Sequence, residues 1–165
     1  MPQVDFYHLT RSDMAEALVM LVKKSQLAGK KVLVQCPRPA AEAMDEALWT
    51  QDPESWIPHG LDDADGASHA HAWIMSVPEG NPISAEFLFL LHGAERPDMT
   101  SFERVFNLFD GRSDAQLSEA RSQWQEWRKN EALEMRYFAQ DDEGKWEKRG
   151  LSLIHISEPT RRIEI

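Results

Sequence analysis

Hydrophobic and polar positions alternate along this chain with two periods, one typical of strands and one typical of helices. Residues 4–9 form an aromatic and aliphatic run that predicts a buried first strand. Ser12 or Asp13 can cap a helix that extends to about Ala28, where a glycine follows. The apolar positions of this helix recur at helical spacing: Met14, Leu18, Leu21 and Val22. A second, short apolar strand is predicted within residues 30–36, before prolines interrupt it.

The same alternation continues through the rest of the chain. Residues 40–49 are rich in strong helix formers and predict a second helix. A long helix is predicted over residues 114–131, with an apolar face made of Leu117, Ala120, Trp124 and Trp127. Further strands are predicted at residues 72–77, 87–91, 104–109 and 133–139, and residues 62–70 indicate an exposed polar loop. Strands that alternate with helices predict a three-layer α/β domain, with a mainly parallel sheet and helices on both faces.

Composition places the chain among single globular domains. It has 165 residues, of which 42% are hydrophobic and 28% charged, so one domain with a substantial core is expected. It lacks a run of about eighteen apolar residues, and its first residues lack the basic and apolar regions of a signal peptide. We therefore expect a cytoplasmic protein without a membrane segment. Cys36 is the only cysteine, which excludes a disulfide framework and a thiolate metal cluster.

The charge balance argues against direct, tight binding of nucleic acid. The formal net charge is −10, whereas proteins that neutralise phosphates usually carry a basic excess. The overall field therefore repels DNA, and any contact with DNA is expected to be indirect.

Residues 151–165 are set apart from the domain predicted for residues 1–150. The segment LSLIHISEPTR resembles a transposase sequencing adapter translated in frame, and it follows a charged stretch that is typical of a domain end. We expect these residues to be a non-native tail, so the fold prediction rests on residues 1–150.

Two chemical alternatives can be weighed from the residues alone. The first strand is followed by Thr10 and three further residues without glycine, so a phosphate-binding loop is not indicated for a nucleotide-binding regulator. A metal-dependent hydrolase could use His59, His69 and His71, but zinc sites need three or four ligands held in fixed geometry. We assign no catalytic residue, no metal and no cofactor, and both alternatives stay open.

The segment DEALWTQDPESWIPHGL, residues 45–61, is the most distinctive in the chain. Trp49 and Trp56 flank a proline break, and Pro58 and His59 follow directly. Large aromatic side chains are costly to leave in water unless they are packed or meet a partner. This segment is therefore a candidate interaction surface.

A series of ordered fragments resembles the chi subunit of bacterial DNA polymerase III. The fragments are FYHL, GKKVLVQC, DEALW, SWIPHGL, VFNLFD, ARSQWQEWRK and MRYFAQ, which together span residues 4–148. The resemblance implies a nucleotide-binding-like fold without a P-loop and a non-catalytic accessory protein. Members of that family bridge the clamp-loader complex, through the psi subunit, to the acidic C-terminal tail of single-stranded-DNA-binding protein.

The resemblance also implies two sets of contact residues. Arg121, Gln125 and Arg128 share one helix face, and arginine can bind a carboxylate with two hydrogen bonds. The complete set implied for the acidic tail is Phe109, Arg121, Trp124, Gln125 and Arg128, with Arg11 as a weaker candidate. The set implied for the clamp-loader side is Trp56, Pro58, His59 and Leu61.

Two details of these sets are specific to this sequence. Gln125 and Leu117 stand where the family can carry basic residues, so this chain has fewer cations on that helix. On the clamp-loader side we expect Trp49 to lie mostly inside the domain, with Trp56 and His59 nearer the surface.

Overall fold

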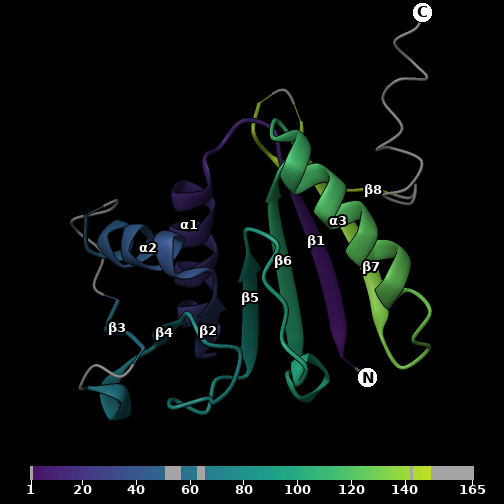
Figure 1. Ribbon diagram of the computed structural model, residues 1–165. Coiled ribbons are helices and arrows are strands. Elements are labelled where there is room, and N and C mark those ends of the chain that lie inside the picture. Colours follow the sequence, from purple (N-terminus) through teal and green to yellow (C-terminus); the bar gives the residue numbers. More distant parts are fainter. Residues whose placement is uncertain (1, 51–56, 63–65, 142, 150–165) are drawn as a thin grey trace, which may run out of the picture.

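This computed structural model describes residues 2–50, 57–62, 66–141 and 143–149, and its strands form a single sheet (Figure 1). The strand order is β3-β4-β2-β5-β6-β1-β7-β8. The strands are β1 (Gln3–Leu9), β2 (Val32–Gln35), β3 (His59–Leu61), β4 (Ala72–Met75), β5 (Phe87–Leu91), β6 (Arg104–Asp110), β7 (Glu134–Gln140) and β8 (Trp146–Arg149). Neighbouring strands are parallel except β7 and β8, which pair antiparallel. The predicted mainly parallel sheet is confirmed.

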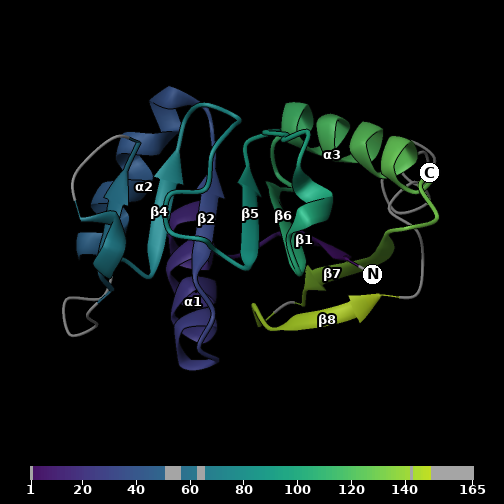
Figure 2. The same ribbon diagram turned by 90° about the horizontal axis from the view of Figure 1, so that it is seen from below.

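Helices cover both faces of this sheet, as predicted. The helices are α1 (Met14–Leu27), α2 (Arg38–Thr50) and α3 (Asp114–Trp127), with short 3-10 turns η1 (Ala67–His69) and η2 (Met99–Ser101). Viewed from below, α1 and α3 lie on opposite sides of the sheet (Figure 2). The buried residues of α1 and α2 belong to one apolar cluster, and those of α3 belong to a second cluster on the other face. The fold is therefore a three-layer α/β fold.

Local chemistry explains where the helices begin and end. Asp13 accepts a hydrogen bond from the backbone N–H of Glu16 at 2.8 Å, and the Glu16 carboxylate accepts one from the N–H of Asp13 at 3.0 Å. This capping box starts α1. Helix α3 ends at Trp127 rather than at the predicted residue 131, because a turn must bring the chain back to β7 alongside β1. In that turn the N–H of Asn130 bonds to the carbonyl of Trp127 at 3.0 Å.

The sequence pattern does not predict β8, which follows the last expected strand, and it does not predict β3 either. Strand β3 shows the reason most clearly. It has only three residues, and its central Gly60 pairs with Trp73 of the parallel strand β4. A Cβ atom on Gly60 would lie 2.4 Å from the Trp73 ring, so the two strands can approach only because this residue is glycine. A three-residue strand centred on glycine carries no alternating pattern, so its sequence gives no strand signal.

Alternation along β1 separates the two cores. Val4 and Phe6 belong to the cluster under α3, whereas Tyr7 and Leu9 belong to the cluster under α1. Asp5 is fully buried on the α1 side. It is held there by two arginines, one from each neighbouring strand: Arg104 on β6 and Arg136 on β7.

Candidate functional site

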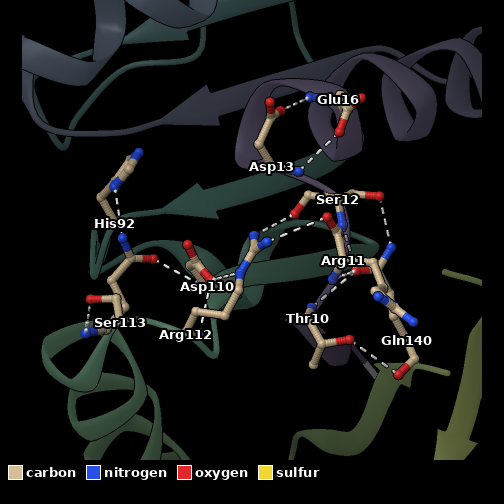
Figure 3. A network of polar contacts seen from close by, with 11 residues as sticks. Thr10, Arg11, Ser12, Asp13, Glu16, His92, Asp110, Arg112, Ser113 and Gln140 are labelled. Atoms are coloured by element: carbon tan, nitrogen blue, oxygen red, sulfur yellow. Dashed lines mark hydrogen bonds and ion pairs between the residues drawn. The ribbon is translucent and has the colours of Figure 1, made fainter. Parts of the chain in front are cut away.

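The carboxyl ends of parallel strands are where α/β folds usually bind ligands, and here they carry a dense polar network (Figure 3). The backbone N–H groups of Thr10, Arg11 and Ser12 all donate to the side-chain oxygen of Gln140, at 3.0, 2.9 and 3.1 Å. Gln140 is 5% exposed, and its amide nitrogen donates to the Ser12 hydroxyl at 2.8 Å. The turn after β1 therefore has its N–H groups occupied by a side chain from the end of β7.

Arg112, just after β6, bonds to the same turn after β1. Its guanidinium donates to the Asp110 carboxylate at 2.8 Å and to the carbonyl oxygen of Ser12 at 2.8 Å. Burial alone would raise the pKa of Asp110, but hydrogen bonds from Arg112 outweigh it, so the pKa lies below its ordinary value. Gln116 extends the network, because it accepts a hydrogen bond from the Asp110 N–H at 2.9 Å and its amide nitrogen lies 3.4 Å from Nδ1 of His92.

This network argues against the alternative that the protein is a nucleotide-binding regulator. A phosphate at the end of β1 needs unpaired backbone N–H groups, and here the Gln140 oxygen already accepts three of them. Hydrogen bonds within the protein therefore join the ends of β1, β6 and β7, and we call this arrangement the internal clamp.

The histidines proposed for a metal-dependent hydrolase do not form a ligand set in the described residues. No group of three candidate ligands lies close enough to hold a metal within residues 2–50, 57–62, 66–141 and 143–149. The ring nitrogens of His59 already lie 2.7 Å from the carbonyl of Ile57 and 3.2 Å from that of Asp45. Cys36 is buried, and burial, followed by the nearby Asp62 carboxylate, raises the pKa of its thiol to about 12.

The segment around Trp49 differs from the prediction in a specific way. Trp49 is 56% exposed, whereas the side chain of His59 has no exposed surface, so both expectations about these residues were wrong. Helix α2 buries Ala41, Met44, Ala47 and Leu48, and Trp49 lies beside that stripe on the solvent side. Its ring packs against that of His59 at an interplanar angle of 54°, with centroids 4.5 Å apart, and thereby covers the imidazole.

Pro58 and Leu61 complete the described part of this surface. Both are half-buried, and Leu61 lies at the end of β3 beside β4. Trp56 lies outside the described residues. The exposed aromatic anchor in the described part is therefore Trp49.

Helix α3 holds the other predicted set. Gln125 and Arg128 are exposed and Arg121 is half-buried. Phe109 is 2% exposed and Trp124 is 8% exposed, and both rings pack around Phe6, at centroid distances of 6.4 and 5.1 Å. The two aromatic rings therefore form the floor beneath α3 and do not line an open pocket.

Two N–H groups on this helix lack a hydrogen-bond partner within the described part of the chain. Nε of Arg121 and Nε1 of Trp124 are both buried, and neither has a partner among the described residues. Residues spaced three apart on a helix lie on neighbouring turns of the same face. Most buried polar groups in proteins are hydrogen-bonded, so these two unpaired donors mark α3 as a candidate binding face. Arg11, the weaker candidate, is exposed, and its backbone N–H belongs to the Gln140 clamp.

Fold and sites together define a class of protein: an α/β protein with nucleotide-binding-like layering, whose strand ends are closed by its own side chains and whose helix α3 carries two buried donors that are unpaired within the described residues. Among the described residues, no helix is both long and apolar enough to cross a membrane. The chain belongs to the family of the DNA polymerase III chi subunit, HolC, whose family model matches residues 1–134. No curated protein matches the chain. Family membership confirms the resemblance found in the sequence and makes the chain an accessory subunit of DNA polymerase III in DNA replication.

Proposed function

We propose that this subunit is a non-catalytic adaptor that bridges the clamp-loader complex, through a psi subunit, to the acidic C-terminal tail of single-stranded-DNA-binding protein. Its mechanism is tethering. Two moderate contacts on one rigid body raise the effective concentration of the polymerase assembly near coated single strands. DNA itself is contacted through the partner, in keeping with a net charge of −10.

The observation that carries the tail-binding half of this proposal is the pair of unpaired donors on α3. A carboxylate of the tail accepts hydrogen bonds from Nε of Arg121 and Nε1 of Trp124, which have no partner among the described residues. Gln125 and Arg128 are exposed on the same helix and extend the surface along the tail. Charge-assisted hydrogen bonds of this kind are roughly twice as strong as neutral ones.

An apolar residue of the tail has to find room beside these donors. Phe109 and Trp124 supply the apolar floor, and a modest outward shift of the Trp124 ring would let a tail side chain rest on them. The proposed tail site therefore has Arg121 and Trp124 as donors and Phe109 as buried support. Gln125 and Arg128 complete it on the exposed side of α3.

Calorimetry with a synthetic tail peptide tests this site. Arg121→Ala should weaken binding about tenfold or more, because a hydrogen bond to a charged group contributes roughly 1.5–3 kcal/mol. Lys145→Ala is the matched control, since it removes one positive charge from a side chain that is 77% exposed on another part of the surface. Equal affinities for Arg121→Ala and wild type would defeat the assignment. Added salt should also weaken binding.

A second pair of variants isolates the indole donor. Trp124→Phe keeps an aromatic ring in the floor but removes Nε1, so affinity for the tail should fall several-fold while the fold persists. Trp127→Phe is the matched control, because Trp127 is equally buried on the same helix and its indole nitrogen is not among the unpaired atoms.

We propose the clamp-loader contact for the surface around Trp56, Pro58, His59 and Leu61, and we include Trp49, which is exposed and covers the buried His59 ring. Exposed tryptophans are the residues that most often dominate interface energies. Trp56→Ala and Trp49→Ala should each reduce co-purification with the psi subunit and spare the tail contact. Leu27→Ala, at the last residue of α1, where the side chain is 89% exposed, is the control. Normal co-purification of both tryptophan variants would contradict the proposed surface.

We also propose that the native domain comprises residues 1–150 and that residues 151–165 are translated adapter sequence. Deleting residues 151–165 should leave the affinity for the tail peptide unchanged. Resequencing of the locus that returned an uninterrupted native frame through these residues would refute this assignment.

A further inference from the structure

A second arginine–tryptophan pair with unpaired donors lies on the opposite face of the sheet. Nε of Arg104, on β6, and Nε1 of Trp146, on β8, are buried and have no hydrogen-bond partner among the described residues. Both residues line the same pocket, on the α1 side, whose volume is about 260 Å³. Because unpaired buried donors are rare, two of them around one cavity indicate a ligand that brings acceptor atoms.

Half of the residues that line this pocket are aromatic. They include Tyr7, Phe87, Phe106, Phe138 and Trp146. The Tyr7 ring stacks on Phe138 with centroids 5.0 Å apart and meets the edge of Trp146 at 4.8 Å. Such walls favour a flat, apolar ring, since aromatic pairs prefer stacked or edge-on contacts at these separations.

The charge around the pocket is positive, in contrast to the chain as a whole. Lys24 and Arg104 line it, and no Asp or Glu of the described chain does. The Asp5 carboxylate, which is paired with Arg104, is fully buried. Its two oxygens also accept hydrogen bonds from Arg136, each at 2.8 Å. An anionic group that enters the pocket therefore meets two cations and no free carboxylate.

Tyr7 can supply one more donor. Burial, with the nearby Asp5 carboxylate second, raises the pKa of the Tyr7 phenol, so its hydroxyl stays protonated at neutral pH. The pocket thus combines aromatic walls with several N–H and O–H groups in its lining.

We propose that this pocket binds a small aromatic carboxylate, with the ring between the aromatic walls and the carboxylate at Arg104 and Trp146. The volume suits such a ligand, because a cavity of roughly 150 Å³ accommodates benzene. The remaining space, out of about 260 Å³, takes a short acidic chain. This site is separate from the tail-binding face of α3 and does not depend on the proposed function.

Nuclear magnetic resonance of the full ¹⁵N-labelled chain with 3-phenylpropionate tests the proposal. The indole N–H signal of Trp146, assigned by its loss in Trp146→Phe, should shift downfield and saturate with a Kd on the order of 1 mM, as expected for a ligand of this size. The matched probe is the neutral isostere 3-phenylpropionamide, which should bind about tenfold more weakly because it lacks the charge. Equal shifts with both probes, or none with either, would overturn the proposal.

Variants then separate this site from the tail site. Lys24→Gln, at an exposed position on α1, should weaken 3-phenylpropionate binding several-fold, whereas Arg121→Ala should leave it unchanged. The tail peptide should shift the Trp124 indole signal and not that of Trp146. If the peptide shifts Trp146 instead, the pocket is the tail-binding site and the proposal of an independent site is wrong. Loss of 3-phenylpropionate binding in Arg121→Ala would equally refute it.

Discussion

Replacing Gln140 tests whether the clamp at the strand ends is structural. Gln140→Met keeps the length of the side chain but removes the oxygen that accepts from the N–H groups of Thr10, Arg11 and Ser12. It also removes the donors to Ser12 and to the Gly144 carbonyl. A net hydrogen bond contributes about 1 kcal/mol, so losing the three acceptor bonds alone should cost roughly 3 kcal/mol. For a domain of this length that corresponds to a fall of roughly 6–12 °C in Tm.

Urea denaturation and thermal unfolding measure the loss directly. The control is Gln125→Met, the same substitution at an exposed position on α3, which should change stability by less than about 0.5 kcal/mol. Emptying the clamp also gives a second, opposite signal. With its N–H groups exposed, the turn after β1 resembles an anion-binding nest, so inorganic phosphate should stabilise Gln140→Met more than wild type. Equal stability of the Gln140 and Gln125 variants would show that water replaces the amide and would refute the clamp.

Two further perturbations address buried charge. Arg136→Met removes two hydrogen bonds of 2.8 Å to fully buried Asp5, and it should lower the free energy of unfolding in urea by about 3 kcal/mol. The control is Arg38→Met, whose arginine side chain is 61% exposed and whose loss should cost less than about 1 kcal/mol. Similar losses for both variants would contradict the role of Arg136 in stabilising Asp5. A hydrogen bond from Arg96 lowers the pKa of Asp98 below its ordinary value of 3.8, so the stabilisation is present above that pH and is lost as pH falls through the lower folded-state pKa. Stability measured from pH 6 to pH 2 should fall less steeply at the acidic end for Asp98→Asn than for wild type, and parallel curves would exclude a contribution from Asp98.

Local pattern was enough to predict most of the fold, because most of its elements are encoded locally. The helix cap at Ser12 or Asp13, the apolar stripe of α3 and the buried runs of β2 and β5 are short-range signals, and the structure confirms them, with Asp13 as the capping residue. Strand β3 was missed because glycine is required at position 60 by the Trp73 ring on the neighbouring strand, and this contact cannot be seen in the local sequence. The prediction that Trp49 is buried was wrong, because a tryptophan at the edge of the apolar stripe of a helix can face either the core or the solvent.

The site was less accessible to sequence reasoning, because its decisive contacts join distant parts of the chain. Gln140 meets Thr10 across 130 positions, and nothing near either residue marks the pair. Arg104 and Trp146 are equally unmarked, since their shared pocket exists only after β6, β1, β7 and β8 pair. Arg121 was found because family resemblance pointed to it, whereas its unpaired Nε became visible only in three dimensions.

Asp5 links the rigidity of the sheet to its binding chemistry. It lies on β1 between β6 and β7, and it pairs with Arg104 on one side and Arg136 on the other. One buried carboxylate therefore ties three parallel strands together, and removing one partner would leave a charge that is expensive to bury. The same contact engages one end of the Arg104 guanidinium, whose carbon lies 4.4 Å from the Phe106 ring centroid, and leaves Nε unpaired. Holding a donor in place before any ligand arrives lowers the entropy lost on binding. Arg136→Met should therefore weaken 3-phenylpropionate binding although Arg136 does not line the pocket, and unchanged affinity in a folded variant would separate Asp5 from ligand binding.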